Sequence, residues 1–551
     1  MRGAKLLAQT LEDGDVEYAF GLAGSAILGL LDEIEQSDVE FVTARHEQVA
    51  TSMAAGYALA SRKPTATLAH VGPGAANQVL GVAAANRDNI PVVAISGNEP
   101  SHRLGRSVRH EWDVTGIFEK FTKHNVRIRD DDAAQQLRDA LNQAVNGVPG
   151  AVHIDFPRDL EEADVEPPNE HDERKFREKD HTASTVRARP TREAVEETAE
   201  LLKAAEKPLV IAGNEVRWFD AAEPLLELAK TAELPVATTK NARGAIPESS
   251  PYSLGLIGRP GVDATNEYLE DADLVIGVGT RFSDITTLNW ELMSSEKTIV
   301  HATLQDRELD RQYVADVNAF GDVSSFATDL AEELSDANLS FSDVAAESRA
   351  DWERAHEEFL DPTIEPAEEG VDPRKLVTAI DDQVEEYSFT TGGGVHAHFP
   401  RRTLVDDLNG TFVTGNFAGM SQGFPLAMGA QLALDHQMFC FEGDGGFSMV
   451  IQDLETAVRE EIPVKTVILN NNSYMSQRAR QRRYYEERYT GSTFTNPDFG
   501  EIAEDFGMPG RSIDEDDEIE EAVDWFLDVE GPALLEAEID PWLDTGGYDR
   551  D

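Results

Sequence analysis

The fold is decided by the run Phe441-Glu442-Gly443-Asp444-Gly445-Gly446-Phe447, where a predicted strand ends in a glycine-rich turn. Glycines in such a turn let backbone N–H groups approach a phosphate closely. A second predicted strand, over 466–469, ends at Asn470-Asn471, and a helix expected to begin near Ile451 lies between the two strands. A carboxylate and an amide oxygen are ligands that Mg²⁺ accepts beside phosphate oxygens. Gly-Asp-Gly alone would be an ordinary turn, but with the second strand end the pattern predicts a diphosphate and magnesium site.

Strands and helices alternate through three blocks of the chain, which predicts α/β architecture with three doubly wound parallel-sheet domains. We expect these domains over 1–165, 191–333 and 371–551, joined by polar linkers over 166–190 and 334–370. The clearest expected strands are 39–43, 65–69, 91–95 and 150–154, then 209–211 and 274–278, then 437–441 and 466–469.

The composition limits the class of protein. The 551 residues include 48 Lys and Arg against 104 Asp and Glu, for a formal net charge of −56. Because such a field repels nucleic acid and anionic membranes, we expect neither as a partner. The charge is spread along the chain and 13 Lys stand against 35 Arg, so the composition resembles proteins of a salt-saturated cytoplasm; an ordinary acidic protein is the alternative. With one cysteine, no apolar run of bilayer length and no signal peptide, we expect a cytoplasmic protein without disulfides.

The glycine turn and the second strand end together resemble the signature of thiamine-diphosphate-dependent enzymes. The resemblance implies that Asp444, Asn471 and the carbonyl of Ser473 hold Mg²⁺, which in turn holds the cofactor diphosphate. It also implies cofactor contacts from the turn itself and from three other segments; these residues are Val395, His396, Ala418, Met420, Gly443, Gly445, Gly446 and Tyr474. Met420 would support the bent form of the cofactor, although core packing is the commoner role of a methionine.

The same resemblance implies a catalytic carboxylate after the second strand of the first block, and Glu47 stands there, ahead of a helix of small residues. Beside the cofactor's pyrimidine ring, this carboxylate would promote the proton transfer that creates the nucleophile, and the cofactor would serve as electron sink. A lone glutamate at a helix start is otherwise only a favourable dipole contact. Because the family builds each site between the first block of one subunit and the third block of another, we expect a homo-oligomer, either a dimer or a tetramer.

Within the family the chain resembles acetolactate synthase large subunits over 72–77, 121–125 and 279–282. The implied reaction is decarboxylation of a 2-oxo acid with carboligation of the resulting enamine to a second carbonyl, in a catalytic subunit that a regulatory subunit can accompany. The chain departs from that group at Ile285 and Arg480, where the group has Arg and Trp. It also lacks acidic residues over 300–305, the strand against which that group holds FAD, so FAD is doubtful.

Two other enzymes of the family offer alternatives. Ser25 and His70 stand where benzoylformate decarboxylase, a 2-oxo acid decarboxylase, has a serine and a histidine over the reacting carbon. They could bind a carboxylate and relay protons, unless His70 is a hydrogen-bonded structural residue. The run 474–491 resembles sulfoacetaldehyde acetyltransferase and concentrates arginines, among them Arg478 and Arg480, which suit an anionic carbonyl substrate unless they pair with acidic residues nearby.

A different class must also be weighed, a non-catalytic binding module that keeps the same fold. Such a module would have no need of the catalytic carboxylate or of the metal ligands. The sequence retains Glu47, Asp444 and Asn471, which favours an enzyme.

Overall fold

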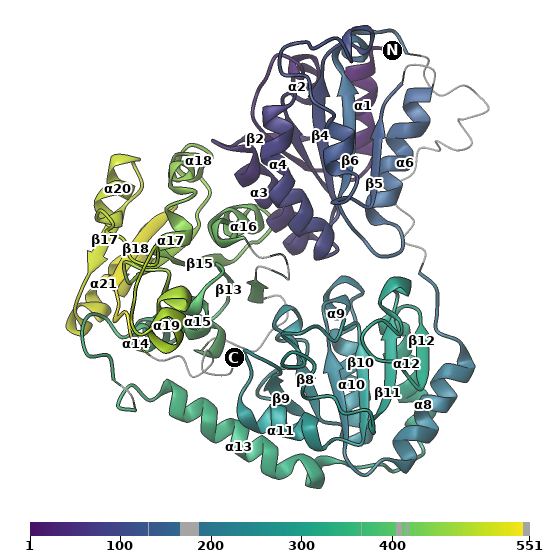
Figure 1. The fold of residues 1–551 in the computed structure, drawn as a ribbon, viewed down its shortest axis with the longest axis vertical. Helices are drawn as coiled ribbons and strands as arrows, with labels where there is room; N and C mark the ends of the chain where they lie inside the picture. Colours follow the sequence, from purple (N-terminus) through teal and green to yellow (C-terminus); the bar gives the residue numbers. More distant parts are fainter. Residues whose placement is uncertain are drawn as a thin grey trace.

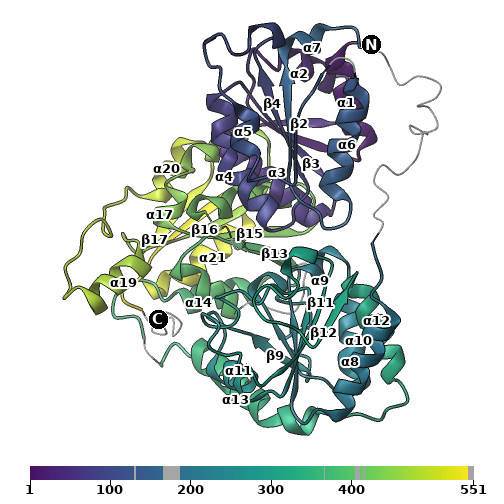
Figure 2. The same cartoon turned by 45° about the vertical axis from the view of Figure 1, so that its right-hand side comes forward.

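A computed structural model describes residues 1–129, 132–165, 187–364, 366–403, 410–413, 415, 417 and 419–543. They form three α/β domains, each built on a six-stranded sheet with parallel strand pairs. Figures 1 and 2 show helices covering both faces of each sheet. The predicted architecture of three doubly wound parallel-sheet domains is confirmed. Most of the expected linker 166–190 falls outside the described residues.

The first sheet has the order β2-β1-β3-β4-β6-β5. Its strands are β1 (Tyr18–Gly21), β2 (Glu40–Thr43), β3 (Thr65–Ala69), β4 (Val92–Asn98), β5 (His124–Arg127) and β6 (Val152–Pro157). Its helices are α1 (Gly3–Asp13), α2 (Leu28–Ile34), α3 (Glu47–Ser61), α4 (Pro73–Arg87), α5 (Val114–Phe118), α6 (Ala133–Val145) and α7 (Arg158–Glu162). The strand order reverses beside β1 and β3, which is where parallel α/β sheets bind ligands. Ser25, Glu47 and His70 follow the strands at this point.

The central sheet has the order β12-β11-β10-β7-β8-β9. Its strands are β7 (Pro208–Ala212), β8 (Val236–Thr238), β9 (Ser253–Leu256), β10 (Leu274–Val278), β11 (Thr298–Thr303) and β12 (Val317–Phe320). Its helices are α8 (Arg192–Ala204), α9 (Glu215–Trp218), α10 (Ala222–Ala232), α11 (Asp263–Asp271) and α12 (Val323–Leu334). The longer helix α13 (Ser342–Leu360) then runs toward the third domain (Figure 1).

The third sheet has the order β14-β13-β15-β16-β18-β17. Its strands are β13 (Tyr387–Thr391), β14 (Thr411–Val413), β15 (Gln437–Gly443), β16 (Lys465–Asn470), β17 (Gly510–Ile513) and β18 (Ala533–Glu538). Its helices are α14 (Pro373–Asp381), α15 (His398–Thr403), α16 (Gly423–Gln431), α17 (Asp444–Phe447), α18 (Leu454–Arg459), α19 (Met475–Tyr484), α20 (Phe499–Asp505) and α21 (Ile519–Asp528). The carboxyl ends of β13, β15 and β16 are neighbours, so the motifs that follow them gather at one edge.

One local prediction is wrong. The helix after β15 begins at Asp444 and not near Ile451, because Gly443 serves as an extended N-cap and the first helical turn starts at the strand end. Residues Ile451–Asp453 form only a 3₁₀ turn ahead of α18. Asp444 therefore lies in the first turn of a short helix, where backbone N–H groups have no partner within the helix.

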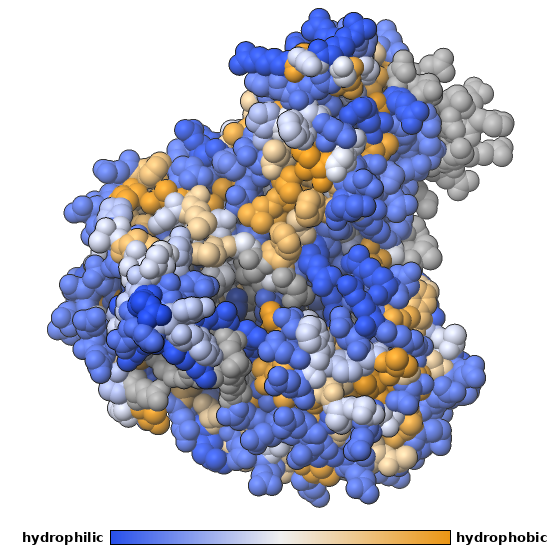
Figure 3. Space-filling model, in the orientation of Figure 1, coloured by the Kyte–Doolittle hydropathy of each residue, from blue (hydrophilic) through white to orange (hydrophobic). Residues whose placement is uncertain are grey.

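Helices α3 and α16 join the first and third domains. The backbone of Gly56 on α3 contacts the carbonyl of Leu426 on α16, an approach that any side chain at Gly56 would prevent. Gln48 at the start of α3 donates a hydrogen bond to Ser421, just ahead of α16. Figure 3 shows a largely hydrophilic face, with hydrophobic residues gathered where the first domain meets the third. Within the described ranges, no helix is both long and apolar enough to cross a membrane.

Candidate active site

Glu47 is the first residue of α3, directly after β2. His46 caps this helix, since its ring nitrogen Nδ1 accepts the N–H of Gln48 at 3.2 Å. Glu47 is only 9% exposed, and its Oε2 accepts the side-chain amide of Asn77, on α4, at 2.9 Å. A side chain at Gly74 would come within 2.9 Å of Oε1, so this glycine leaves room for the second oxygen. One carboxylate oxygen is thus fixed, and the other has no hydrogen bond from the described residues.

His70 follows β3 and Ser25 follows β1, and the residue before Ser25, Gly24, lies against the His70 side chain. The Nδ1 atom of His70 is buried without a hydrogen-bond partner among the described residues. Its ring meets that of His110 edge to face at 5.8 Å. Burial lowers the pKa of His70 below its ordinary value, and the His110 imidazole lowers it further. Ser25 is exposed, so the pair presents a neutral imidazole and a hydroxyl at the sheet edge that also carries Glu47.

Asp444 is 2% exposed at the end of β15. Burial raises the pKa of its carboxyl group to about 6, while the Asn496 amide and the backbone N–H groups of Gly445, Ser473 and Asn472 oppose that rise. Asn496 Nδ2 donates to Asp444 Oδ2 at 2.8 Å. The carboxylate is therefore held by several donors, which is the environment of a buried anion or of a metal ligand.

Asn471 and Ser473 follow β16, the neighbouring strand. Asn471 Oδ1 accepts the Ser473 N–H at 3.1 Å and the Ser473 hydroxyl at 3.0 Å. Across the described part of the chain, no group of three or more His, Cys, Asp and Glu side chains could hold a metal ion. Mg²⁺ needs only one or two carboxylates when phosphates supply further oxygens. One carboxylate, one amide oxygen and one carbonyl therefore fit Mg²⁺ that is bound together with a diphosphate.

The glycines of the turn make space at the strand end. A side chain at Gly445 would meet the ring of Tyr474 at 2.5 Å, and one at Gly446 would meet the Met420 carbonyl at 2.5 Å. Gly443 lies against the ring of His396. These contacts gather most of the predicted cofactor residues of the third domain around one turn, whose backbone N–H groups suit a diphosphate.

Val395 and His396 belong to a 3₁₀ turn after β13. His396 Nε2 and Glu442 Oε2 lie 4.0 Å apart, and neither atom has a hydrogen-bond partner among the described residues. Burial, with the nearby Arg401 charge, lowers the pKa of His396 to about 3, and burial raises the pKa of Glu442 to about 8. Both groups are therefore neutral near pH 7. Two unpartnered polar atoms beside the glycine turn fit a polar ligand bound there.

Met420 is 36% exposed, so it is not a core residue. It contacts the turn through Gly446 and stands at the start of the segment that leads into α16. This placement suits contact with a ligand over the turn. Ala418, the other residue predicted in this segment, falls outside the described residues.

The arginines of α19 have aromatic neighbours. The Arg478 guanidinium lies 4.0 Å from the ring centre of Trp542, and that of Arg482 lies 4.6 Å from the same ring. Arg482 also lies 3.9 Å from Glu487. Arg480 is exposed. Stacking on Trp542 was not expected from the sequence, since the two segments lie far apart along the chain.

The two groups of predicted residues come from different domains, and no hydrogen bond or ion pair among the described residues joins Glu47 to Asp444. Their neighbours do meet, through the Gln48–Ser421 hydrogen bond. No pattern in the sequence marks Asn496 or Glu442 as a residue of the site. A polar residue inside a loop, or at the buried end of a strand, carries no periodic signal.

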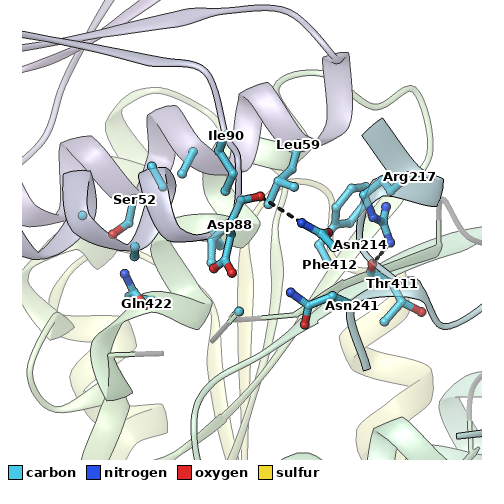
Figure 4. Close-up of a pocket in the computed structure, with 16 residues that line it drawn as sticks. Ser52, Leu59, Asp88, Ile90, Asn214, Arg217, Asn241, Thr411, Phe412 and Gln422 are labelled. Carbon is cyan, nitrogen blue, oxygen red and sulfur yellow. Dashed lines mark hydrogen bonds between the residues drawn. The ribbon is translucent and has the colours of Figure 1, made fainter. Parts of the chain in front are cut away.

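A pocket of about 560 Å³ lies at the junction of the three domains (Figure 4). Residues of α3 such as Ser52 face residues of the central and third domains across it. Asn214 donates to the Asp88 carbonyl at 3.0 Å, and Arg217 donates to the Thr411 carbonyl at 2.6 Å. None of the predicted site residues lines this pocket, so it is separate from the chemistry described above.

A second pocket, of about 460 Å³, lies at the carboxyl ends of β7, β8 and β10 in the central domain. The resemblance would place FAD against the adjoining end of β11. There the buried carboxylate of Glu215 accepts bonds from the Thr303 hydroxyl, the Leu304 N–H and the Gln305 amide, at 2.6, 2.9 and 2.7 Å. These three donors are already occupied, and β11 itself contains no Asp or Glu. This strand end therefore gives no support to FAD binding.

The chain is similar to known proteins over most of its length. Three family models match the chain: "Thiamine pyrophosphate enzyme, N-terminal TPP binding domain" over 1–117, the "central domain" over 195–330 and the "C-terminal TPP binding domain" over 394–537. A probable acetolactate synthase large subunit of Methanocaldococcus jannaschii is 31% identical, over 98% of this chain and 92% of its own. The Escherichia coli acetolactate synthase isozyme 2 large subunit is also 31% identical, over 98% and 96% of the two chains. The mitochondrial catalytic subunit of Saccharomyces cerevisiae acetolactate synthase is 29% identical, over 98% and 81%. The matches extend over all three domains, and the chain belongs to the thiamine pyrophosphate enzyme family, among relatives named as acetolactate synthase large subunits.

Proposed function

We propose that this chain is the catalytic subunit of an acetolactate-synthase-type enzyme that uses thiamine diphosphate and Mg²⁺. It would decarboxylate a 2-oxo acid and join the remaining acyl unit to a second carbonyl compound. The observation that carries the proposal is the Glu47 carboxylate, buried at a helix start and oriented by Asn77. The strand-end set of Asp444, Asn471 and Ser473, and the relatives aligned over nearly the whole chain, support it.

When bound, thiamine diphosphate supplies a carbon nucleophile and an electron sink. The Oε1 atom of Glu47 would hold and return a proton at the pyrimidine ring, while Asn77 keeps Oε2 in place. Asp444, Asn471 and the Ser473 carbonyl would bind Mg²⁺. The N–H groups of the glycine turn and neutral His396 would donate to the diphosphate, and Met420 would contact the cofactor over the turn.

We also propose how the subunits assemble and in which environment the protein works. Because Glu47 and Asp444 stand on separate domains without a direct bond, a homo-oligomer that pairs the first domain of one subunit with the third domain of another would complete the site. Relatives named as large subunits support a possible regulatory partner. The acidic, lysine-poor composition supports a salt-rich cytoplasm as the working environment.

A second candidate is decarboxylation without carboligation. His70 lies against Gly24, the residue before Ser25, at the sheet edge that carries Glu47, and its buried Nδ1 has no hydrogen-bond partner among the described residues. As a neutral imidazole it could relay a proton from water to the reacting carbon, in place of the joining to a second carbonyl. The arginines of α19 leave a third substrate class open, a sulfonate-bearing aldehyde.

Glu47→Gln tests whether the protein is an enzyme of this kind. The substitution keeps the shape and removes the ionisable oxygen, so turnover of 2-oxo acids should fall by about 10²–10⁴-fold while thiamine diphosphate still binds. Unchanged turnover in the variant would refute the proposed role. Cofactor binding by the unmodified chain, without turnover of any 2-oxo acid or of a sulfonate-bearing aldehyde, would make it a binding module.

A further inference from the structure

Asn496 lies where the two strand-end loops of the third domain meet. Its side-chain Nδ2 donates to Asp444 Oδ2 at 2.8 Å and to Asn470 Oδ1 at 2.9 Å. Its backbone N–H donates to Asn472 Oδ1 at 3.0 Å. One residue therefore ties the loop after β15 to the loop after β16.

Buried hydrogen bonds fix the orientation of Asn470, one of the residues that accept a hydrogen bond from Asn496. Asn470 Nδ2 donates to Glu536 Oε1 at 2.7 Å, which turns the Asn470 carbonyl oxygen toward Asn496. Glu536 Oε2 accepts the Phe499 N–H at 2.6 Å and the Ser512 hydroxyl at 2.8 Å. Asn470 and Glu536 are 3% and 2% exposed. The amide of Asn470 therefore has one satisfied orientation, and Asn496 has a fixed acceptor on this side.

The segment that carries Asn496 is itself held against the metal-ligand loop. Tyr474 N–H donates to the Ser492 carbonyl at 2.9 Å, and Phe494 N–H donates to the Asn472 carbonyl at 3.0 Å. The rings of Tyr474 and Phe494 meet at 4.9 Å. The segment thus runs beside the loop after β16, and the backbone of Asn496 has little freedom to move relative to Asp444.

We propose that Asn496 is a positioning residue of the magnesium site. By occupying Oδ2 of Asp444 it directs Oδ1 toward the cation, and by holding Asn470 and Asn472 it sets the distance between Asp444 and Asn471. The inference rests on the proposed function, since it requires Mg²⁺ between those two residues. Residues that orient metal ligands through hydrogen bonds typically change metal affinity by about 10–100-fold when they are replaced.

The test is calorimetric titration of Mg²⁺ into the full chain at saturating thiamine diphosphate. For Asn496→Ala we expect the dissociation constant for Mg²⁺ to rise by about 10–100-fold. Asn318→Ala is the matched control, since Asn318 makes the same amide-to-carboxylate bond, to Asp310 at 2.9 Å, in the central domain. Asn496→Gln keeps the amide but lengthens the side chain by one methylene group. We expect its dissociation constant for Mg²⁺ to lie between those of the wild type and Asn496→Ala.

A second readout separates positioning from loss of structure. At saturating Mg²⁺, kcat of Asn496→Ala should return to within a few-fold of the wild type, because excess cation refills a weakened site. Tight Mg²⁺ binding by Asn496→Ala, or equal weakening in Asn318→Ala, would overturn the inference. If Asn496→Ala does not fold, wild-type affinity in Asn496→Gln would overturn it. Failure of the wild type to bind Mg²⁺ with the cofactor would instead defeat the proposed function.

Discussion

The side-chain amide of Asn77 donates to the Glu47 carboxylate at 2.9 Å, across the gap between the starts of α4 and α3. The bond fixes one oxygen of the carboxylate that we propose as catalytic, and so would decide which oxygen faces the cofactor. A hydrogen bond to a charged group contributes about 1.5–3 kcal/mol, enough to matter for the orientation of a proton-transfer group.

Replacing Asn77 should therefore slow the reaction without preventing thiamine diphosphate from binding. For Asn77→Ala we expect kcat to fall by about tenfold or more, because the carboxylate loses its orienting donor. Asn77→Asp should be worse, since it places a second carboxylate beside Glu47. The measurements are kcat and the dissociation constant of thiamine diphosphate. Wild-type kcat in both variants would show that the contact has no role.

The buried Glu442 predicts how the stability of the folded protein changes with pH. Its pKa is raised from 4.5 to about 8 by burial, so the folded protein holds a proton that the unfolded chain has released. This stabilisation is complete below pH 4.5 and is lost as the pH rises through 8, with a slope of at most about 1.4 kcal/mol per pH unit. Thermal unfolding of the cofactor-free protein should show the loss, and Glu442→Gln should flatten it. Parallel curves for the two proteins would contradict the assignment of a protonated Glu442.

Arg480, an exposed arginine of α19, gives a prediction for substrate binding. The charge reversal Arg480→Glu should raise KM for an anionic substrate several-fold and leave kcat nearly unchanged. Arg192→Glu is the matched control, because Arg192 is an exposed arginine on α8 and the variant has the same net charge. High salt screens distant charges, so only a local contact should distinguish the two variants. Equal KM values would mean that Arg480 does not contact the substrate.

The occupied hydrogen-bond donors at the end of β11 predict that the protein does not bind flavin. Because the Glu215 carboxylate occupies the donors of Thr303, Leu304 and Gln305, the purified chain should show no flavin absorbance and should not retain added FAD after gel filtration. Thiamine diphosphate with Mg²⁺ should be retained under the same conditions. Stoichiometric FAD in the purified protein would contradict this account of the central domain.

The sequence predicts those features of the fold and the site that depend on residues close together along the chain. Alternating strands and helices predict the three parallel sheets, and the glycine turn with Asn470-Asn471 marks a strand-end site, because such motifs lie within a few residues of one strand. The start of α17 at Asp444 was missed, since the N-cap role of Gly443 depends on the backbone geometry at the end of β15. Asn496 was missed for another reason. Its partners are 52 and 26 residues away along the chain, and only the packed sheet brings them within a hydrogen bond.

The stacking of Arg478 on Trp542 could not be predicted from the sequence for the same reason as the hydrogen bonds of Asn496. The sequence shows a cluster of arginines in an acidic chain, which favours an anionic partner. It gives no sign that two of them, Arg478 and Arg482, lie over the ring of Trp542. Distant contacts of this kind depend on the fold of the whole domain.

The most direct test of the account is the product formed from pyruvate. The full chain would be incubated with thiamine diphosphate and Mg²⁺ in concentrated KCl, and acetolactate, acetaldehyde and CO₂ would be quantified together. Acetolactate synthase chemistry predicts one acetolactate for each CO₂, with loss of both products in Glu47→Gln. Acetaldehyde in place of acetolactate, or no consumption of pyruvate while benzoylformate, glyoxylate or sulfoacetaldehyde is consumed, would contradict it.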